Sequence, residues 1–171
     1  MIHEPPIVAD TTPWDIAEGE VDRWRGACIQ VFARSEAATT ETLIALAKDA
    51  STKVKLPHLV GARFEALYTA VAIGGGSVAG APRLKAALDA FREHDDVRTI
   101  LCHGVAQVAI DRRGEWIVVL RCTSCRSGSA EQIVRTFTVA QAAEVFAEIQ
   151  HDAQVLSSLL GQLRKSLKSE A

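Results

Sequence analysis

HDDVRTILCHG, residues 94–104, closes a helical pattern that begins near Pro82. Residues three and four positions apart share one face of a helix, and the apolar face of this pattern is made by Leu84, Leu88 and Phe91. Continued along the same helix, that face reaches Asp95, Arg98 and Cys102. Because burial of an unpaired charge costs free energy, charged groups on a core-facing line are usually paired or functional. The stretch therefore predicts a polar site at the end of a central helix.

The chemistry of this site rests on Arg98 and His103. Arginine holds two phosphate oxygens with a planar pair of donors, and histidine moves protons near neutral pH. Such a pair needs no metal. Five residues on a straight helix turn the two side chains about 140° apart, so they do not converge within one ideal helix. Gly104 follows at once, and we expect it to end the helix in the left-handed conformation and to redirect His103.

Arg98, four intervening residues, His103 and then Gly104 resemble the R-x(4–6)-H signature of the HEPN superfamily (higher eukaryotes and prokaryotes nucleotide-binding). The resemblance implies a small helical bundle, and many members are metal-independent ribonucleases that act as dimers. As the alternative to a His103 redirected by fraying at Gly104, it implies that each protomer contributes to a shared cleft, in which Arg98 holds phosphate and His103 moves protons. Asp95, one turn earlier, is expected to orient or neutralise Arg98. Thr99 stands where many members carry Asn, Asp or His.

Two functions are open at this point. The first is a metal-independent endoribonuclease, a toxin or defence component, with RNA as substrate and an antitoxin or nucleotidyltransferase-like protein as partner. The second is a non-catalytic interaction or nucleotide-binding module of the same fold. In that case Arg98 pairs with Asp95 and the helix dipole, and His103 is a capping residue. An exposed cleft shared by Arg98 and His103 favours the first function, and burial of Arg98 against Asp95 favours the second.

The rest of the chain predicts mostly helices. Thr12-Pro13-Trp14-Asp15 is a helix start, and apolar residues recur at helical spacing as far as Phe32. The segment up to Leu46 either continues this helix or forms a second one from Thr39 or Thr40. Another helix covers Leu59 to Val71. Residues 1–11 are expected to be a flexible arm before a single domain over residues 12–171.

After Gly104 the apolar residues alternate, which is typical of strands. We expect strands over residues 105–110, 115–122 and 132–139, with a serine-rich loop over residues 123–130. Thr138 and Gln141 fit a capping box that begins the last helix. The predicted fold is mainly α: a four- or five-helix bundle with a small antiparallel β-meander inserted before the last helix. Arginines gather on this sheet, where they either hold an RNA backbone or form an ordinary solvated face: Arg112, Arg113, Arg121, Arg126 and Arg135.

Composition limits the remaining possibilities. A hydrophobic fraction of 48% in 171 residues is enough for one core, and a net charge of −2 disfavours a nucleic-acid binder held by charge alone. No apolar stretch has the length of a membrane span and no signal peptide is apparent, so we expect a soluble, cytoplasmic protein without membrane contact. We expect a homodimer packed through the motif helix, because the apolar line of that helix ends in groups poorly suited to a monomer core.

The four cysteines suggest no disulfide framework. Cys28 and Cys102 fall on predicted helix faces, where a reduced cysteine behaves as a small buried hydrophobe. Cys122 and Cys125 form a C-x2-C pair, which is half of a zinc site. Because no second pair follows at a suitable spacing, we expect no metal and no cofactor.

Overall fold

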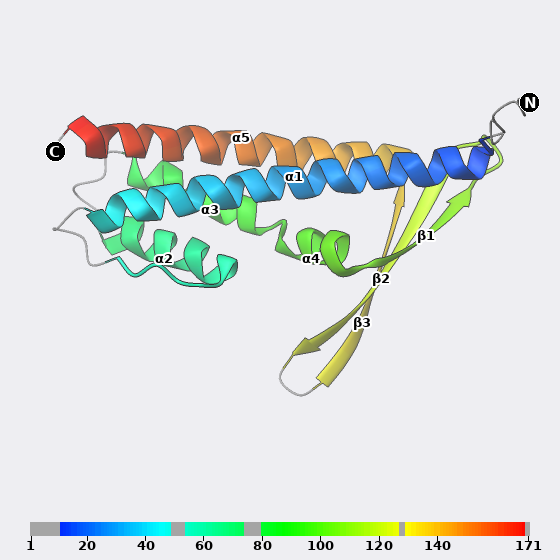
Figure 1. Ribbon diagram of the computed structural model, residues 1–171, viewed down its shortest axis with the longest axis horizontal. Helices are drawn as coiled ribbons and strands as arrows, with labels where there is room; N and C mark the ends of the chain where they lie inside the picture. The colour runs from blue at the N-terminus through cyan, green and yellow to red at the C-terminus, as the bar shows by residue number, and fades with distance from the viewer. Residues whose placement is uncertain (1–10, 49–53, 74–79, 127–128, 170–171) are drawn as a thin grey trace, which may run out of the picture.

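The computed structural model describes residues 11–48, 54–73, 80–126 and 129–169, so that residues 1–10 of the expected arm lie outside it. Within these ranges the chain forms five helices and three strands (Figure 1). In chain order they are α1 (Pro13–Lys48), α2 (Val60–Ile73), α3 (Ala81–Arg92), α4 (Asp95–His103), β1 (Val105–Ile110), β2 (Trp116–Arg126), β3 (Ser129–Thr138) and α5 (Val139–Ser169). The mainly helical fold with a small antiparallel sheet before the last helix is confirmed.

Two long helices, α1 and α5, lie side by side and form the spine of the molecule (Figure 1). The start of α1 is fixed by Thr12 and Asp15: each backbone N–H donates to the other side chain, at 2.8 and 3.2 Å. The start of α5 uses the expected capping box, in which the Thr138 N–H donates to Gln141 Oε1 at 3.0 Å and the Gln141 N–H donates to Thr138 Oγ1 at 3.3 Å. No second helix begins near Thr39, because α1 continues unbroken to its end.

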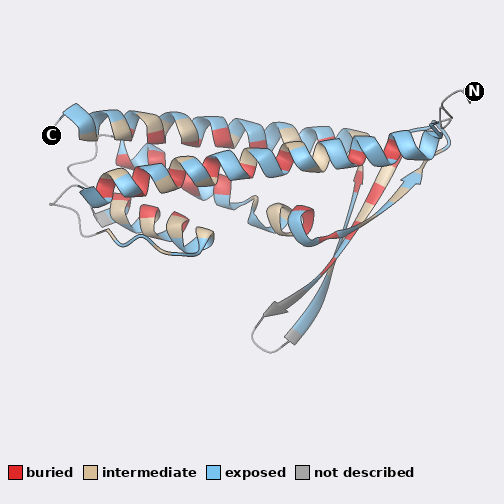
Figure 2. Cartoon of the chain, in the orientation of Figure 1, coloured by how far each residue is buried: buried red, intermediate tan, exposed pale blue. Residues whose placement is uncertain are grey.

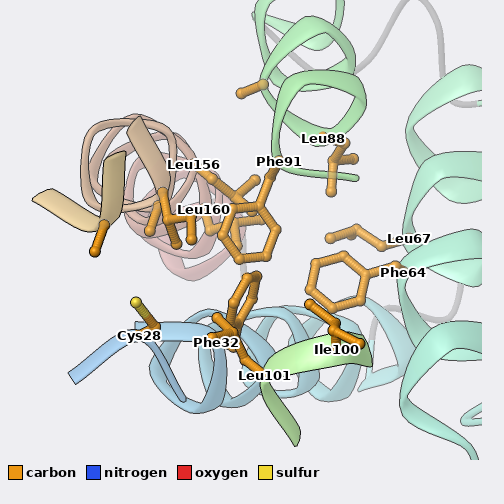
Figure 3. Packing of buried hydrophobic residues seen from close by; sticks show 14 of the residues in the cluster. Cys28, Phe32, Phe64, Leu67, Leu88, Phe91, Ile100, Leu101, Leu156 and Leu160 are labelled. Carbon is orange, nitrogen blue, oxygen red and sulfur yellow. The ribbon is translucent and has the colours of Figure 1, made fainter. Parts of the chain in front are cut away.

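The helices enclose a core of aromatic and aliphatic side chains (Figure 3). The ring of Phe91 on α3 lies 5.7 Å from that of Phe32 on α1 and 5.8 Å from that of Phe64 on α2, centroid to centroid. Leu156 and Leu160 of α5 are fully buried. Figure 2 shows the buried residues on the facing sides of the helices, as expected for amphipathic helices around one core.

The sheet has the order β1-β2-β3, with antiparallel neighbours. Its inner face packs on α1 around Trp24, whose ring lies 5.9 Å from Trp116 and 5.1 Å from Phe137. The indole N–H of Trp24 donates to the carbonyl oxygen of Ala142 at 2.9 Å, which ties the sheet end of α1 to the start of α5. This aromatic contact therefore fixes the sheet against both long helices.

The expected loop over residues 123–130 is wrong, because β2 continues to Arg126 and β3 starts at Ser129. Thr123 pairs with Gln132 there, and Ser124 with Glu131. β1 begins opposite Arg121, so beyond that residue β2 pairs with β3 alone. Polar residues suit this two-stranded part of the sheet. Backbone pairing continues where the hydrophobic alternation, the signal used for strands, has already ended.

The expected single helix from Pro82 to His103 is also wrong, because α3 ends at Arg92 and α4 starts at Asp95. At the break the His94 N–H donates to the Phe91 carbonyl at 3.3 Å, a three-residue step that tightens the turn. The His94 imidazole contacts the Asp152 carboxylate of α5 at 2.8 Å, and only 13% of its side chain is exposed. No glycine or proline marks this break, and a tertiary contact holds it.

The break rotates α4 relative to the face that α3 buries. Ile100 and Leu101 are the buried residues of α4, whereas Cys102 is exposed. The sequence-based placement of Cys102 on the core face is therefore wrong, because that placement assumed one continuous helix.

Gly104 ends α4 in an extended conformation, with φ −72° and ψ 131°, and not in the expected left-handed one. Its N–H donates to the Ile100 carbonyl oxygen at 2.8 Å. A Cβ at this position would lie 2.3 Å from that oxygen and 3.2 Å from the Cβ of Leu120 on β2. Glycine is thus required by the close approach of the chain and not by its backbone conformation.

We expect Gly104→Ala to lower the free energy of unfolding by about 1–3 kcal/mol, because the added methyl group overlaps backbone atoms. Gly26→Ala is the matched control: it lies on the exposed side of α1, and nothing lies within 4 Å of its added Cβ. This control should raise the free energy of unfolding by about 0.5–1 kcal/mol, since alanine favours a helix. Denaturant unfolding of both variants is the measurement. A Gly104→Ala protein as stable as the control would disprove the close contact.

Candidate functional site

All four site residues expected from the sequence lie on α4, but Arg98 has a different partner from the one expected. Its Nη2 contacts Oε1 of Glu36 on α1 at 2.6 Å, with 35% of the Arg98 side chain and 21% of the Glu36 side chain exposed. No ion pair joins Arg98 to Asp95 in the part of the chain that the structure describes. The spacing on one helix favoured Asp95, whereas the packing of α4 on α1 brings Glu36 to the guanidinium.

Thr99 and Asp95 interact with each other. The Thr99 hydroxyl donates to the Asp95 backbone carbonyl at 2.8 Å, a bond that a threonine commonly makes within its own helix. The Asp95 carboxylate is exposed in the first turn of α4, where a negative charge favours the helix dipole. The expected support of Arg98 by these two residues is therefore not seen as a contact.

His103 is the last residue of α4, and its side chain is exposed. Within the described ranges, the imidazole has no hydrogen bond or ion pair. Because α4 remains helical through His103, its side chain points about 140° away from that of Arg98 around the helix axis. A single chain therefore holds Arg98 against α1 and leaves His103 open to solvent, and it does not bring the two together.

Sequence reasoning missed Arg25, which contacts the end of α4 from α1. One guanidinium nitrogen, Nη2, donates to the Leu101 carbonyl at 2.7 Å and to the Gly104 carbonyl at 3.0 Å. The last carbonyls of a helix have no partner within the helix, so a cation there is favourable. No local signal could have revealed this contact, because Arg25 lies 76 residues before Leu101 in the chain.

His94 has a structural role, because the Asp152 carboxylate holds its imidazole at the break between α3 and α4. Asp152 also borders a groove between α3 and α5 with a volume of about 710 Å³. Small and aliphatic side chains line most of it, among them Ala86, Ala90 and Val155. The groove therefore offers mainly apolar contact, and its polar lining consists of the paired Asp152 carboxylate with Arg83, His151, Gln154 and Ser158.

The cysteines differ in their surroundings. Cys28 is fully buried, and its burial raises the pKa of the thiol to about 11, so it is not a nucleophile at neutral pH. Cys122 is buried on β2, and the side chain of Cys125 lies outside what the structure describes. No group of three or more possible His, Cys, Asp or Glu ligands converges within the described ranges.

The last two findings concern membrane-spanning helices and similarity to known proteins. Among the helices that the structure describes, none has the length and apolar character that a membrane crossing requires. No protein-family model matches the chain, and no curated protein and no solved structure is significantly similar to it.

Proposed function

We propose that this protein is a metal-independent endoribonuclease of HEPN type, a toxin or defence component that acts as a homodimer. The observation that carries the proposal is the exposed imidazole of His103 at the end of the helix that also carries Arg98. The motif resemblance of Arg98, His103 and Gly104 supports the same assignment, as does the helical fold with a small sheet after the motif.

In the proposed reaction, His103 takes the proton from a ribose 2′-hydroxyl. The 2′-oxygen then attacks the adjacent phosphorus, the bond from phosphorus to the 5′-oxygen breaks, and the protonated imidazole gives its proton to that 5′-oxygen. The products are a 2′,3′-cyclic phosphate and a 5′-hydroxyl. Arg98 stabilises the charge that develops on the phosphate oxygens, because its guanidinium has further donors besides the nitrogen that contacts Glu36.

The directions of the two side chains support a homodimer as part of the proposal. Because Arg98 and His103 point about 140° apart on α4, one protomer's arginine and the other's histidine would line a shared cleft. The proposed partners are therefore RNA, a second copy of the chain, and an antitoxin or nucleotidyltransferase-like protein that controls the activity. Sedimentation of the full chain at high micromolar concentration tests the assembly, and a monomer there rules out the composite cleft.

The decisive experiment is incubation of the full chain with several RNAs in the presence of a chelator. Cleavage that continues without divalent metal and leaves 2′,3′-cyclic phosphate ends supports the proposal. Absence of cleavage of all the RNAs counts against it.

For Arg98, we expect Arg98→Ala to slow cleavage by about 10²–10³-fold, because one charged donor to the phosphate is lost. Arg98→Lys keeps the charge and loses the planar fork, so it should restore only part of the rate. The loss in unfolding free energy should be about 0–1 kcal/mol, since the ion pair with Glu36 is partly exposed.

Arg92→Ala is the matched control for this prediction. Arg92 also makes an ion pair between helices, with Glu65 at 3.1 Å, and its side chain is 41% exposed. The control should lose similar stability without slower cleavage. Equal cleavage rates for Arg98→Ala and Arg92→Ala would show that Arg98 is not part of the catalytic site.

The contact between Arg98 and Glu36 favours a second candidate function, a non-catalytic interaction or nucleotide-binding module of the same fold. In that function the ion pair of Arg98 with Glu36 holds α4 on α1, and His103 is a capping residue at the end of α4. Wild-type protein should then cleave no RNA, and Arg98→Ala should change only the stability of the protein. Measurement of cleavage and melting on the same samples separates the two functions.

A further inference from the structure

The end of α4 is held by two contacts. Nη2 of Arg25 on α1 donates to the carbonyl oxygens of Leu101 and Gly104, at 2.7 and 3.0 Å. Gly104 also packs against β2, where an added Cβ would come within 3.2 Å of Leu120 Cβ. The backbone between these contacts contains only Cys102 and His103.

The contact with Arg25 restrains backbone atoms on both sides of His103. Leu101 O lies two residues before His103, and Gly104 O lies one residue after it. A single donor group that bonds to both carbonyls sets the direction in which the chain leaves the helix. Leu101 itself is fully buried, so the contact with Arg25 holds a residue that the core already fixes. Rotation about the side-chain bonds is then the main freedom left to the imidazole.

A purely electrostatic role does not require this geometry. A cation near the carboxyl end of a helix is favourable wherever it lies within the last turn. Arg25 instead bonds to a carbonyl of α4 and to a carbonyl beyond its end, and so bridges the junction between α4 and β1. That junction is where His103 must be held if it is to transfer a proton.

We propose that Arg25 is a positioning residue for His103: it fixes the backbone at the end of α4 so that the imidazole reaches the scissile phosphodiester in one orientation. This inference rests on the proposed ribonuclease function. Arg25 acts through the backbone, because both N–H groups of its Nη2 are used by the carbonyl oxygens of Leu101 and Gly104.

The test uses Arg25→Met, which keeps an unbranched side chain and removes its donors, and Arg25→Lys, which keeps a charge on a nitrogen one bond short of the position of Nη2. Arg23→Met is the control, because Arg23 is exposed two residues earlier on the same helix. Cleavage in chelator gives kcat and KM, and NMR of the full chain gives the resonances of the His103 imidazole. Assignment of these resonances uses the His103→Ala spectrum.

For Arg25→Met, we expect kcat to fall about 10–100-fold with KM within twofold, because small misplacement of a reacting group has effects of this size. The His103 resonances should shift or broaden, Arg25→Lys should be intermediate, and Arg23→Met should match the wild type. Unchanged kcat and unchanged His103 resonances with a lower melting temperature would mean that Arg25 only stabilises the helix end, which overturns the proposal.

Two further outcomes keep the proposal separate from the function on which it rests. If the wild type cleaves no RNA, the ribonuclease function fails, and the positioning of the imidazole is decided by the resonances alone: unchanged signals in Arg25→Met overturn it. If Arg25→Met does not fold, Arg25→Lys decides, because its ammonium nitrogen ends one bond short of the position from which Nη2 reaches both carbonyls. Wild-type kcat and wild-type resonances in that variant also overturn the proposal.

Discussion

Replacement of His103 by alanine should slow RNA cleavage by about 10²–10⁴-fold, because the group proposed to transfer the proton is removed. The protein should unfold at the same temperature as the wild type. The His103 side chain is exposed and contacts no partner within the described ranges, so its removal costs no packing. Loss of activity without loss of stability is the pattern that distinguishes a catalytic histidine from a helix cap.

Cleavage under single-turnover conditions in chelator is the measurement, with thermal unfolding of the same preparation. His151→Ala is the matched control, because His151 is also an exposed histidine on a helix, in this case α5. It should cleave at the wild-type rate. If His103→Ala cleaves as fast as His151→Ala, the proton is transferred by another group and the proposed site is wrong.

The second large effect concerns stability. Leu101→Ala should lower the free energy of unfolding by about 2–5 kcal/mol, because a fully buried leucine leaves a cavity when it is truncated. For a protein of this size, that corresponds to a fall in melting temperature of roughly 4–20 °C. Cys102→Ala, at the next position, should change the free energy by less than about 0.5 kcal/mol, since its side chain is exposed.

This pair of variants also tests the break between α3 and α4. If the two helices were one, as the periodicity from Pro82 predicted, Cys102 would face the core and its truncation would be the costly one. Denaturant unfolding of both variants decides between the two registers. A larger loss for Cys102→Ala than for Leu101→Ala would show that α4 is rotated from the position described above.

What the sequence predicted correctly depends on local chemistry. The caps at Thr12 and Thr138 are formed by residues three positions apart, so their signal is contained in a few letters of sequence. The strands that pack on α1 have apolar residues at alternate positions, such as Trp116 and Val118, because one face of the sheet is buried. The fold class followed from these local patterns.

What the sequence did not predict depends on contacts between distant residues. His94 binds Asp152 across 58 positions, and this contact holds a break that has no glycine or proline to mark it. Arg98 could be matched from the sequence only with neighbours on its own helix, and Glu36 on α1 was not among them. Arg25 was missed for the same reason. The sequence identified the motif residues on α4, but it did not identify Glu36 and Arg25, the charged residues of α1 that contact this helix.

The pairing of α1 with α5 has a consequence for synthesis on the ribosome. Trp24 bonds to Ala142 across 118 positions, and Arg164 bonds to Ala38 across 126, so each contact forms only after all of the intervening chain has been made. While α5 is still unsynthesised, the nascent chain carries α1 with an uncovered apolar side, a condition in which chaperones are recruited and aggregation starts. Translation must therefore run through α5 before α1 acquires its permanent neighbour.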